Sequence, residues 1–193
     1  MKRREALKNV ALLLGGTVIG GSAFVAGCQS DRKKESQSDK SLFSEKDIEF
    51  MNEIGEVIIP TTDTPGAKAA EVGSFMAIMV TDCYDEEQRK TFVNGLNKMK
   101  NNFSAEYGHF FEEAKLDERT DYLNTLELEV ETYYRQKKTE DPEHFYRMLK
   151  ELTLLGYFTS EVGATQALNY IQTPGSYKAC IPYEEGEKAW AIA

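Results

Sequence analysis

The chain has 193 residues, of which 41% are hydrophobic and 28% charged, and its formal net charge at pH 7 is −9. This acidity opposes binding to nucleic acid, because the phosphate backbone would repel the chain. Beyond the first eight residues, the lysines and arginines form no cluster that would serve as a phosphate footprint. The composition therefore excludes nucleic acid as a partner.

Residues 1–27 have the layout of a cleaved export signal. A positive head with the pair Arg3 and Arg4 precedes an apolar run over residues 10–25, which glycines and hydroxyls interrupt. A membrane-spanning helix needs roughly 20 strongly apolar residues, so this run is too short and too weakly apolar to span. The head resembles the twin-arginine export signal of bacteria, although Ala6 replaces the large apolar residue that is usual there.

The signal ends in a motif for lipid attachment. Residues 25–28, Val-Ala-Gly-Cys, resemble the bacterial lipobox, in which the cysteine thiol takes a diacylglycerol. The alternative is a chance cysteine after an apolar stretch. With acylation at Cys28, the mature chain begins there, and we expect it to be lipid-anchored in the bacterial cell envelope and to face the periplasm. Loss of four basic residues and one acidic residue changes the net charge from −9 to −12.

The mature chain divides into a tether and a folded domain. Residues 28–41 are predicted to be a flexible tether, because residues 29–41 include no apolar side chain that could be buried. Residues 42–193 have a length that suits one domain with a single core, and they show no internal repeat.

The first half of this domain shows three helical patterns. Ser44 with Asp47 predicts a capped helix that continues to residue 58, before Pro60. An apolar helix is expected through residues 72–80. Asp85 with Gln88 then predicts the cap of a third, amphipathic helix.

The second half continues in the same way. A helix is predicted from Asp117, and another from Asp141, where Pro142 would fit the first turn. The latter is expected to run to Phe158, and residues 164–171 could add a short helix. The last twenty residues look irregular but carry aromatic side chains, so they must pack on their own domain or on another subunit. No strand pattern competes, and the predicted class is all-α, a single helical domain with an irregular aromatic C-terminal tail.

Residues with chemistry are few. The sequence has no glycine-rich phosphate loop, no zinc-spaced Cys/His cluster and no haem attachment motif, so we expect no metal, no cofactor and no catalytic residue in this chain. His144 follows Glu143, which leaves a structural or interface role, or a role in proton transfer or metal ligation, as alternatives. The first is favoured, because no second ligand lies at helical spacing from His144.

The loop Pro60–Gly66 also has two interpretations. Asp63, with the hydroxyls of Thr61, Thr62 and Thr64, could hold a cation or a sugar hydroxyl. Alternatively, the aspartate binds nearby backbone amides in a turn that Pro65 and Gly66 shape, and this second interpretation is favoured.

Two cysteines remain in the mature domain. A disulfide between Cys83 and Cys180 would close a loop of about a hundred residues and stabilise the fold by about 3 to 5 kcal/mol in the chain-entropy model. The alternative is two free, buried thiols.

Several stretches together resemble the gluconate 2-dehydrogenase subunit 3 family. They are EVIIPTTDTPGA (56–67), DCY (82–84), HFYRMLKELTLLGYF (144–158) and KAW (188–190). The resemblance implies a small helical accessory subunit that pairs with a large flavoprotein dehydrogenase of the glucose-methanol-choline type, often beside a membrane cytochrome c. It implies FAD in that partner, and help with the partner's folding, export and membrane attachment. Many relatives rely on the cytochrome for anchoring, whereas Cys28 would supply a lipid here.

Three functional hypotheses follow. In the first, the chain is an interaction protein whose contacts to a dehydrogenase include His144, Tyr183 and Trp190. In the second, it is a free-standing carbohydrate-binding lipoprotein with its site at the Asp63 loop. In the third, it is an enzyme in which His144 and Glu143 act as acid and base, and this hypothesis ranks last because no nucleophile or metal completes a site.

Overall fold

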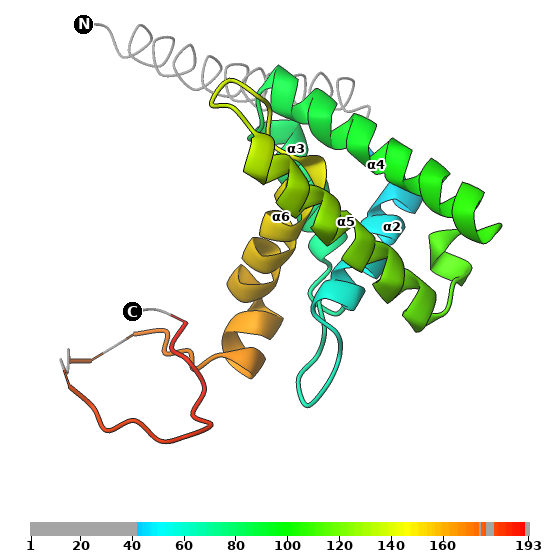
Figure 1. Cartoon of the computed structure of the whole chain (residues 1–193). Helices are drawn as coiled ribbons and strands as arrows, with labels where there is room; N and C mark the ends of the chain where they lie inside the picture. The colour runs from blue at the N-terminus through cyan, green and yellow to red at the C-terminus, as the bar shows by residue number, and fades with distance from the viewer. Residues whose placement is uncertain (1–41, 174, 177–179, 192–193) are drawn as a thin grey trace, which may run out of the picture. The chain divides into compact units, whose positions relative to one another are not determined.

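The computed structural model describes residues 42–173, 175–176 and 180–191, and residues 42–193 form one compact unit. The predicted signal, with Arg3 and Arg4, and the predicted lipidation site Cys28 lie outside the described residues and stay predictions. The described part is helical, which confirms the all-α class (Figure 1). Its elements are α2 (Glu45–Ile58), α3 (Val72–Asp82), α4 (Glu86–Tyr107), the 3-10 turn η1 (Phe111–Glu113), α5 (Leu116–Gln136), α6 (Phe145–Thr159) and the π-helical turn η2 (Gly163–Ala167).

Local signals determine where the first helices begin. Ser44 caps α2: its hydroxyl accepts from the Asp47 amide at 3.3 Å, and Asp47 Oδ2 accepts from the Ser44 amide at 2.8 Å. Asp85 and Gln88 form the same reciprocal arrangement at the start of α4. Both predictions are confirmed, because a capping box depends only on residues three apart.

The predicted start of α6 is wrong. The helix begins at Phe145, with His144 as its N-cap, rather than at Asp141. The Asp141 carboxylate instead accepts from the Lys138 amide at 2.8 Å, and the Pro142 carbonyl accepts from the Tyr133 hydroxyl at 2.6 Å. The aspartate therefore closes a turn in the α5–α6 connection, which is the competing use of the same side chain.

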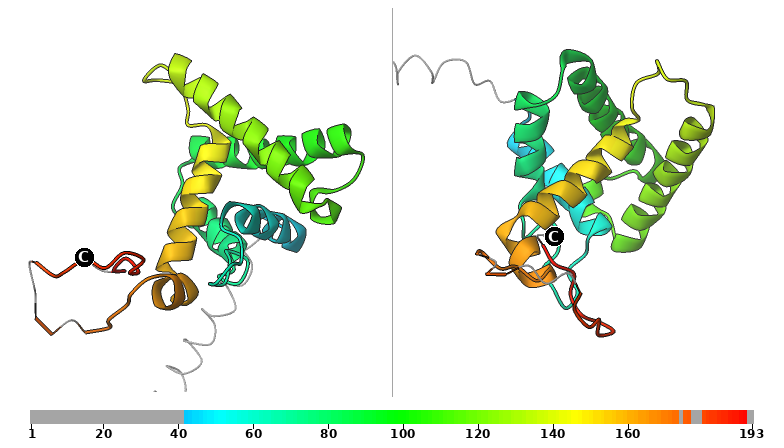
Figure 2. Two further views of the ribbon diagram at one scale, coloured as in Figure 1. Left: turned by 60° about the horizontal axis from the view of Figure 1, so that its bottom comes forward. Right: turned by 90° about the vertical axis from the view of Figure 1, so that its left-hand side faces the viewer.

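Helix α6 occupies the middle of the domain. It contacts α2, α3, α4 and α5. In the right view of Figure 2 it runs between α3 and α5. The approach of α3 is close at Gly156, where a Cβ atom would lie 2.7 Å from the Phe75 ring. The largest fully buried side chains of the core are Phe50, Phe92, Phe103, Phe111, Tyr146 and Tyr157.

Beyond α6 the backbone becomes irregular. The short helix expected over residues 164–171 is present only as η2, which ends at Ala167. A single parallel bridge joins Asn169 to Trp190, through Asn169 N–H to Ala189 O at 2.8 Å and Ala191 N–H to Asn169 O at 2.9 Å. The end of the tail is thus tied back to the segment that follows η2.

Candidate functional site

The family-like sequence 56–67 folds into a loop that is held by one carboxylate. We call residues 59–67 the motif loop. Glu56, in the last turn of α2, accepts from the Thr61 amide at 2.9 Å, from the Thr61 hydroxyl at 2.7 Å and from the Lys68 amide at 2.9 Å. One half-buried side chain therefore binds the backbone on both sides of the loop.

Further contacts fix the loop between these points. The Thr61 hydroxyl accepts from the Gly66 amide at 3.0 Å, and the Tyr157 hydroxyl of α6 donates to the Pro65 carbonyl at 2.7 Å. A Cβ atom on Gly66 would lie 2.4 Å from the Glu56 carboxylate, so the glycine is needed for this carboxylate to stay in place. The favoured interpretation, in which Asp63 binds the loop amides, is wrong, because the carboxylate that accepts from them is Glu56. Asp63 is exposed, and the loop amides do not depend on it.

His144 is used as a helix cap. Its Nδ1 accepts from the Tyr146 amide at 3.3 Å, which requires Nδ1 to be unprotonated. Burial lowers the pKa of His144, the positive charge of Lys98 lowers it further, and the negative charge of Glu129 opposes both. The neutral ring is therefore favoured at this position.

Glu143 is bound elsewhere. Its carboxylate accepts from the Tyr134 hydroxyl and pairs with the Lys137 ammonium, and these contacts hold the pKa of Glu143 below its ordinary value. The adjacent glutamate and histidine are thus each committed to different structural partners. The acid–base arrangement of the third hypothesis is not formed.

A second carboxylate, Glu53 of α2, joins two segments that are distant in sequence. It pairs with Lys68 and with Arg119 of α5, and the Arg119 contact measures 2.5 Å. Burial raises the pKa of Glu53, but the hydrogen bonds and charges of Lys68 and Arg119 outweigh burial and hold it below the ordinary value. Glu53 therefore joins α2 to Lys68, directly after the motif loop, and to Arg119 of α5.

The remaining candidates lie on the surface. Cys83 and Cys180 are not bonded to each other in this structure, and both are exposed rather than buried. A hollow of about 440 Å³ lies between α2, α4 and η1, with Phe50, Phe110 and Lys100 in its lining.

Within the described residues, no cluster of His, Cys, Asp or Glu side chains is arranged to hold a metal ion. None of the described helices combines the length and the apolarity needed to span a bilayer.

The C-terminal end carries most of the exposed apolar surface. Of thirteen large apolar side chains that are exposed in the described part, eight lie in residues 154–190. Every described residue from 180 to 190 is exposed, including Tyr183 at 80% and Trp190 at 44%. The tail therefore leaves its aromatic side chains outside the core of its own domain.

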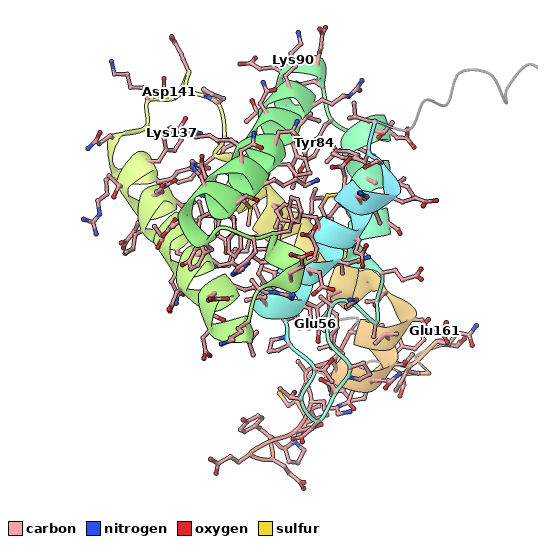
Figure 3. All side chains as sticks on the ribbon, turned by 90° about the vertical axis from the view of Figure 1, so that its right-hand side faces the viewer. Glu56, Tyr84, Lys90, Lys137, Asp141 and Glu161 are labelled. Carbon is pink, nitrogen blue, oxygen red and sulfur yellow. The ribbon has the colours of Figure 1, made fainter. Side chains whose placement is uncertain are left out.

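The structure does not bring all the predicted partner contacts together. His144 caps the first turn of α6, whereas the tail follows its last turn, and a helix of fifteen residues is roughly 22 Å long. Figure 3 shows the same separation, with Lys137 and Asp141 toward one end of the domain and Glu56 and Glu161 toward the other. Tyr183 and Trp190 belong to the second end.

Comparison with known proteins gives one match. The family model described as gluconate 2-dehydrogenase subunit 3 matches residues 45–175, which include the motif loop and all of α2 to η2. No curated protein and no solved structure matches the chain. Because the family model covers well over half of the sequence and the fold that it covers is one helical unit, the chain belongs to the gluconate 2-dehydrogenase subunit 3 family.

Proposed function

We propose that this protein is a non-catalytic accessory subunit of an exported, flavin-dependent sugar or polyol dehydrogenase of the glucose-methanol-choline type. The family is named for a subunit of a dehydrogenase complex, which supports a role in such an assembly. In this proposal the large partner holds the FAD and performs the oxidation. The subunit assists its folding and export and attaches it to the membrane through the lipid on Cys28.

The observation that carries the proposal is the exposure of the C-terminal aromatic and aliphatic side chains. Eight large apolar side chains over residues 154–190 are exposed, whereas the longer stretch of residues 42–153 exposes five. Removal of apolar area from water is favourable, and exposed apolar surface of this kind marks sites of protein–protein interaction. An accessory subunit would bury this surface against its dehydrogenase partner.

The structure of the motif loop also supports a non-catalytic role for this subunit. Its polar groups are used to hold its own backbone, through Glu56, Thr61 and Tyr157. The loop therefore serves the fold at the end of the domain from which the tail leaves. The carbohydrate-binding alternative would need Asp63 as its main ligand, and that side chain is not positioned by any neighbour that the described residues supply.

Isolation of the complex from native membranes tests the proposal. The full chain, carrying an affinity tag within residues 29–41, is purified after mild detergent extraction, and the co-purifying proteins are identified by mass spectrometry and flavin absorbance. We expect a flavoprotein dehydrogenase in stoichiometric amount. A matched chain in which a conventional, lipid-independent cleavable signal precedes Gln29 should move the same complex into the soluble fraction.

Two results would contradict the proposal. One is recovery of the chain alone under conditions that keep other envelope complexes intact. The other is oxidation of a sugar, or a bound redox centre, in the purified chain without a partner. Saturable sugar binding that Asp63→Ala abolishes would favour the free-standing binding protein instead.

A further inference from the structure

The last turns of α6 present an apolar stripe to solvent. Leu154, Leu155 and Phe158 are 41%, 46% and 41% exposed, and spacings of three and four residues place Phe158 beside both leucines on one face. The opposite face of the same turns is buried, through Leu152, Gly156 and Tyr157 among others. The stripe is therefore an unpartnered face of a well-packed helix.

The tail extends this surface. Its exposed members are Tyr170, Ile171, Ile181, Tyr183 and Trp190, and the Asn169–Trp190 bridge returns the last of them to the segment after η2. We call these five residues and the α6 stripe the end surface. It is rich in the aromatic side chains that dominate protein–protein interfaces.

The charges around the end surface are mostly of one sign. Residues 151–193 include five glutamates and two lysines, with no aspartate or arginine. Lys188 donates to the Gln166 carbonyl. Within the described part, Glu161, Glu184, Glu185 and Glu187 form no ion pair, in contrast with the paired charges on α4, such as Lys90 with Glu86. The rim of the surface is therefore acidic and available.

The negative charge around the end surface favours one of three possible binding partners: a membrane, a second copy of this chain or a different protein. A membrane surface is disfavoured, because membrane-binding faces use lysine and arginine and the anionic lipids of a membrane repel carboxylates. A second copy of this chain would place one acidic rim against another. A different protein with basic residues around an apolar centre would gain both apolar burial and charge complementarity.

We propose that the end surface docks a protein partner that presents an apolar patch rimmed by lysine and arginine. The identity of that partner as the flavoprotein dehydrogenase rests on the proposed function, whereas the chemistry of the patch rests on the residues above.

Substitutions on the full chain test the docking surface. The double variant Phe158→Asp and Tyr183→Asp should reduce recovery of the co-purifying protein by about tenfold or more, because charges would be buried at the centre of the interface. The matched control is Leu128→Asp on α5, a leucine with 65% exposure outside the end surface, which should leave recovery unchanged. Circular dichroism and the thermal midpoint establish that each variant is folded.

Salt dependence tests the acidic rim. With partner released from the purified complex, the association rate of the wild-type chain should fall as sodium chloride is raised. The variant with Glu184→Gln, Glu185→Gln and Glu187→Gln should associate more slowly at low salt and show a weaker salt dependence. An equal salt dependence of the wild-type and variant association rates would overturn the proposal that the partner has a basic rim.

The other occupants are tested on a chain that begins at Gln29 and therefore has neither the apolar signal nor the lipid. We expect it to sediment as a monomer and to stay unbound to vesicles of phosphatidylglycerol or phosphatidylcholine. Vesicle binding or dimerisation that the Phe158 and Tyr183 double variant abolishes would overturn the proposal in favour of a membrane or a second copy.

The results also separate this proposal from the proposed function. If all variants recover the flavoprotein equally, the partner does not dock on the end surface, while the proposed accessory role still holds. If the wild-type chain instead recovers one identified protein of another class and the double variant loses it, the surface stands and the accessory role is wrong.

Discussion

Two irregular segments of this domain have opposite relations to the core. The motif loop, residues 59–67, is held by Glu56 on both sides and by Tyr157 in the middle, and Ala67 at its end is buried. The tail, from residue 168 onward, is closed on itself by the Asn169–Trp190 bridge, and Lys188 joins it to the Gln166 carbonyl of η2. Its described residues 180–190 are all exposed.

The difference shows what an irregular segment needs in order to belong to a fold. The motif loop has few apolar side chains, but each free amide near Glu56 finds an acceptor, so the loop is ordered by hydrogen bonds. The tail carries five large apolar side chains that stay exposed. We infer that the first segment stabilises this chain and that the second stabilises an assembly.

The largest expected effect comes from removing the acceptor of the motif loop. Glu56→Ala would leave the amides of Thr61 and Lys68 without a partner, and we expect the free energy of unfolding to fall by about 2 to 4 kcal/mol. Urea denaturation followed by circular dichroism measures it. The matched control is Glu184→Ala in the tail, which should change the free energy by less than about 0.5 kcal/mol. Equal effects of the two substitutions would remove the contrast between the segments.

A smaller effect is expected at the hydrogen bond that joins the loop to α6. Tyr157→Phe keeps the buried ring but removes the donor to the Pro65 carbonyl, and we expect a loss of about 1 kcal/mol. The same urea titration measures this loss. In the Glu56→Ala background the loss should shrink, because the loop would already be released, so a double-mutant cycle sharpens the assignment. Strict additivity would show that the two residues hold the loop independently.

The α5–α6 connection is a third irregular segment, and it ends in the His144 cap. Because the pKa of His144 is lowered in the folded state, the unfolded chain binds the proton more tightly. The stabilisation is present above the unfolded pKa of about 6.5 and is lost as the pH falls through the folded pKa.

The thermal midpoint should therefore decrease between pH 7 and pH 5 in the wild-type chain. His144→Asn keeps an N-cap acceptor that does not titrate, so it should flatten this decrease. The carboxyl groups with lowered pKa values, Asp47, Glu53 and Glu143, lose their stabilisation below this pH window. A variant as pH-dependent as the wild type would assign the effect to other groups.

The smallest effect on unfolding is expected in the tail. Tyr183→Ala and Trp190→Ala should each change the free energy of unfolding of the isolated chain by less than about 0.5 kcal/mol, because both side chains are exposed. Recovery of the partner should nevertheless decrease. A tail substitution that destabilises the isolated chain would show that the tail belongs to the core after all.

Sequence could predict those parts of the structure that depend on neighbouring residues. The caps at Ser44 and Asp85 lie within four residues of their partners, and the helical class follows from apolar spacing. At Asp141 the same type of signal did not mark a helix start. The Asp141 carboxylate accepts from the Lys138 amide, three residues earlier, and so closes a turn instead. Local patterns leave such competition undecided.

The loop shows what the sequence could not supply. Asp63 was the conspicuous acidic residue of the motif, but Glu56 holds the backbone, since only the end of α2 places a carboxylate between the two sides of the loop. The contact from Tyr157 to Pro65 spans 92 residues, so it depends on how α6 packs. The irregular tail was predicted, whereas its exposure required the structure.

The bridge between Asn169 and Trp190 has a practical consequence for anyone who handles this protein. It returns residues 190 and 191 to the stretch that follows η2, so a fusion or purification handle attached directly after them would start beside the aromatic tail. Such a handle would compete sterically for the very site under study, and a lost interaction would then report the label rather than the molecule. Handles belong ahead of α2, whose capped first turn begins the ordered domain.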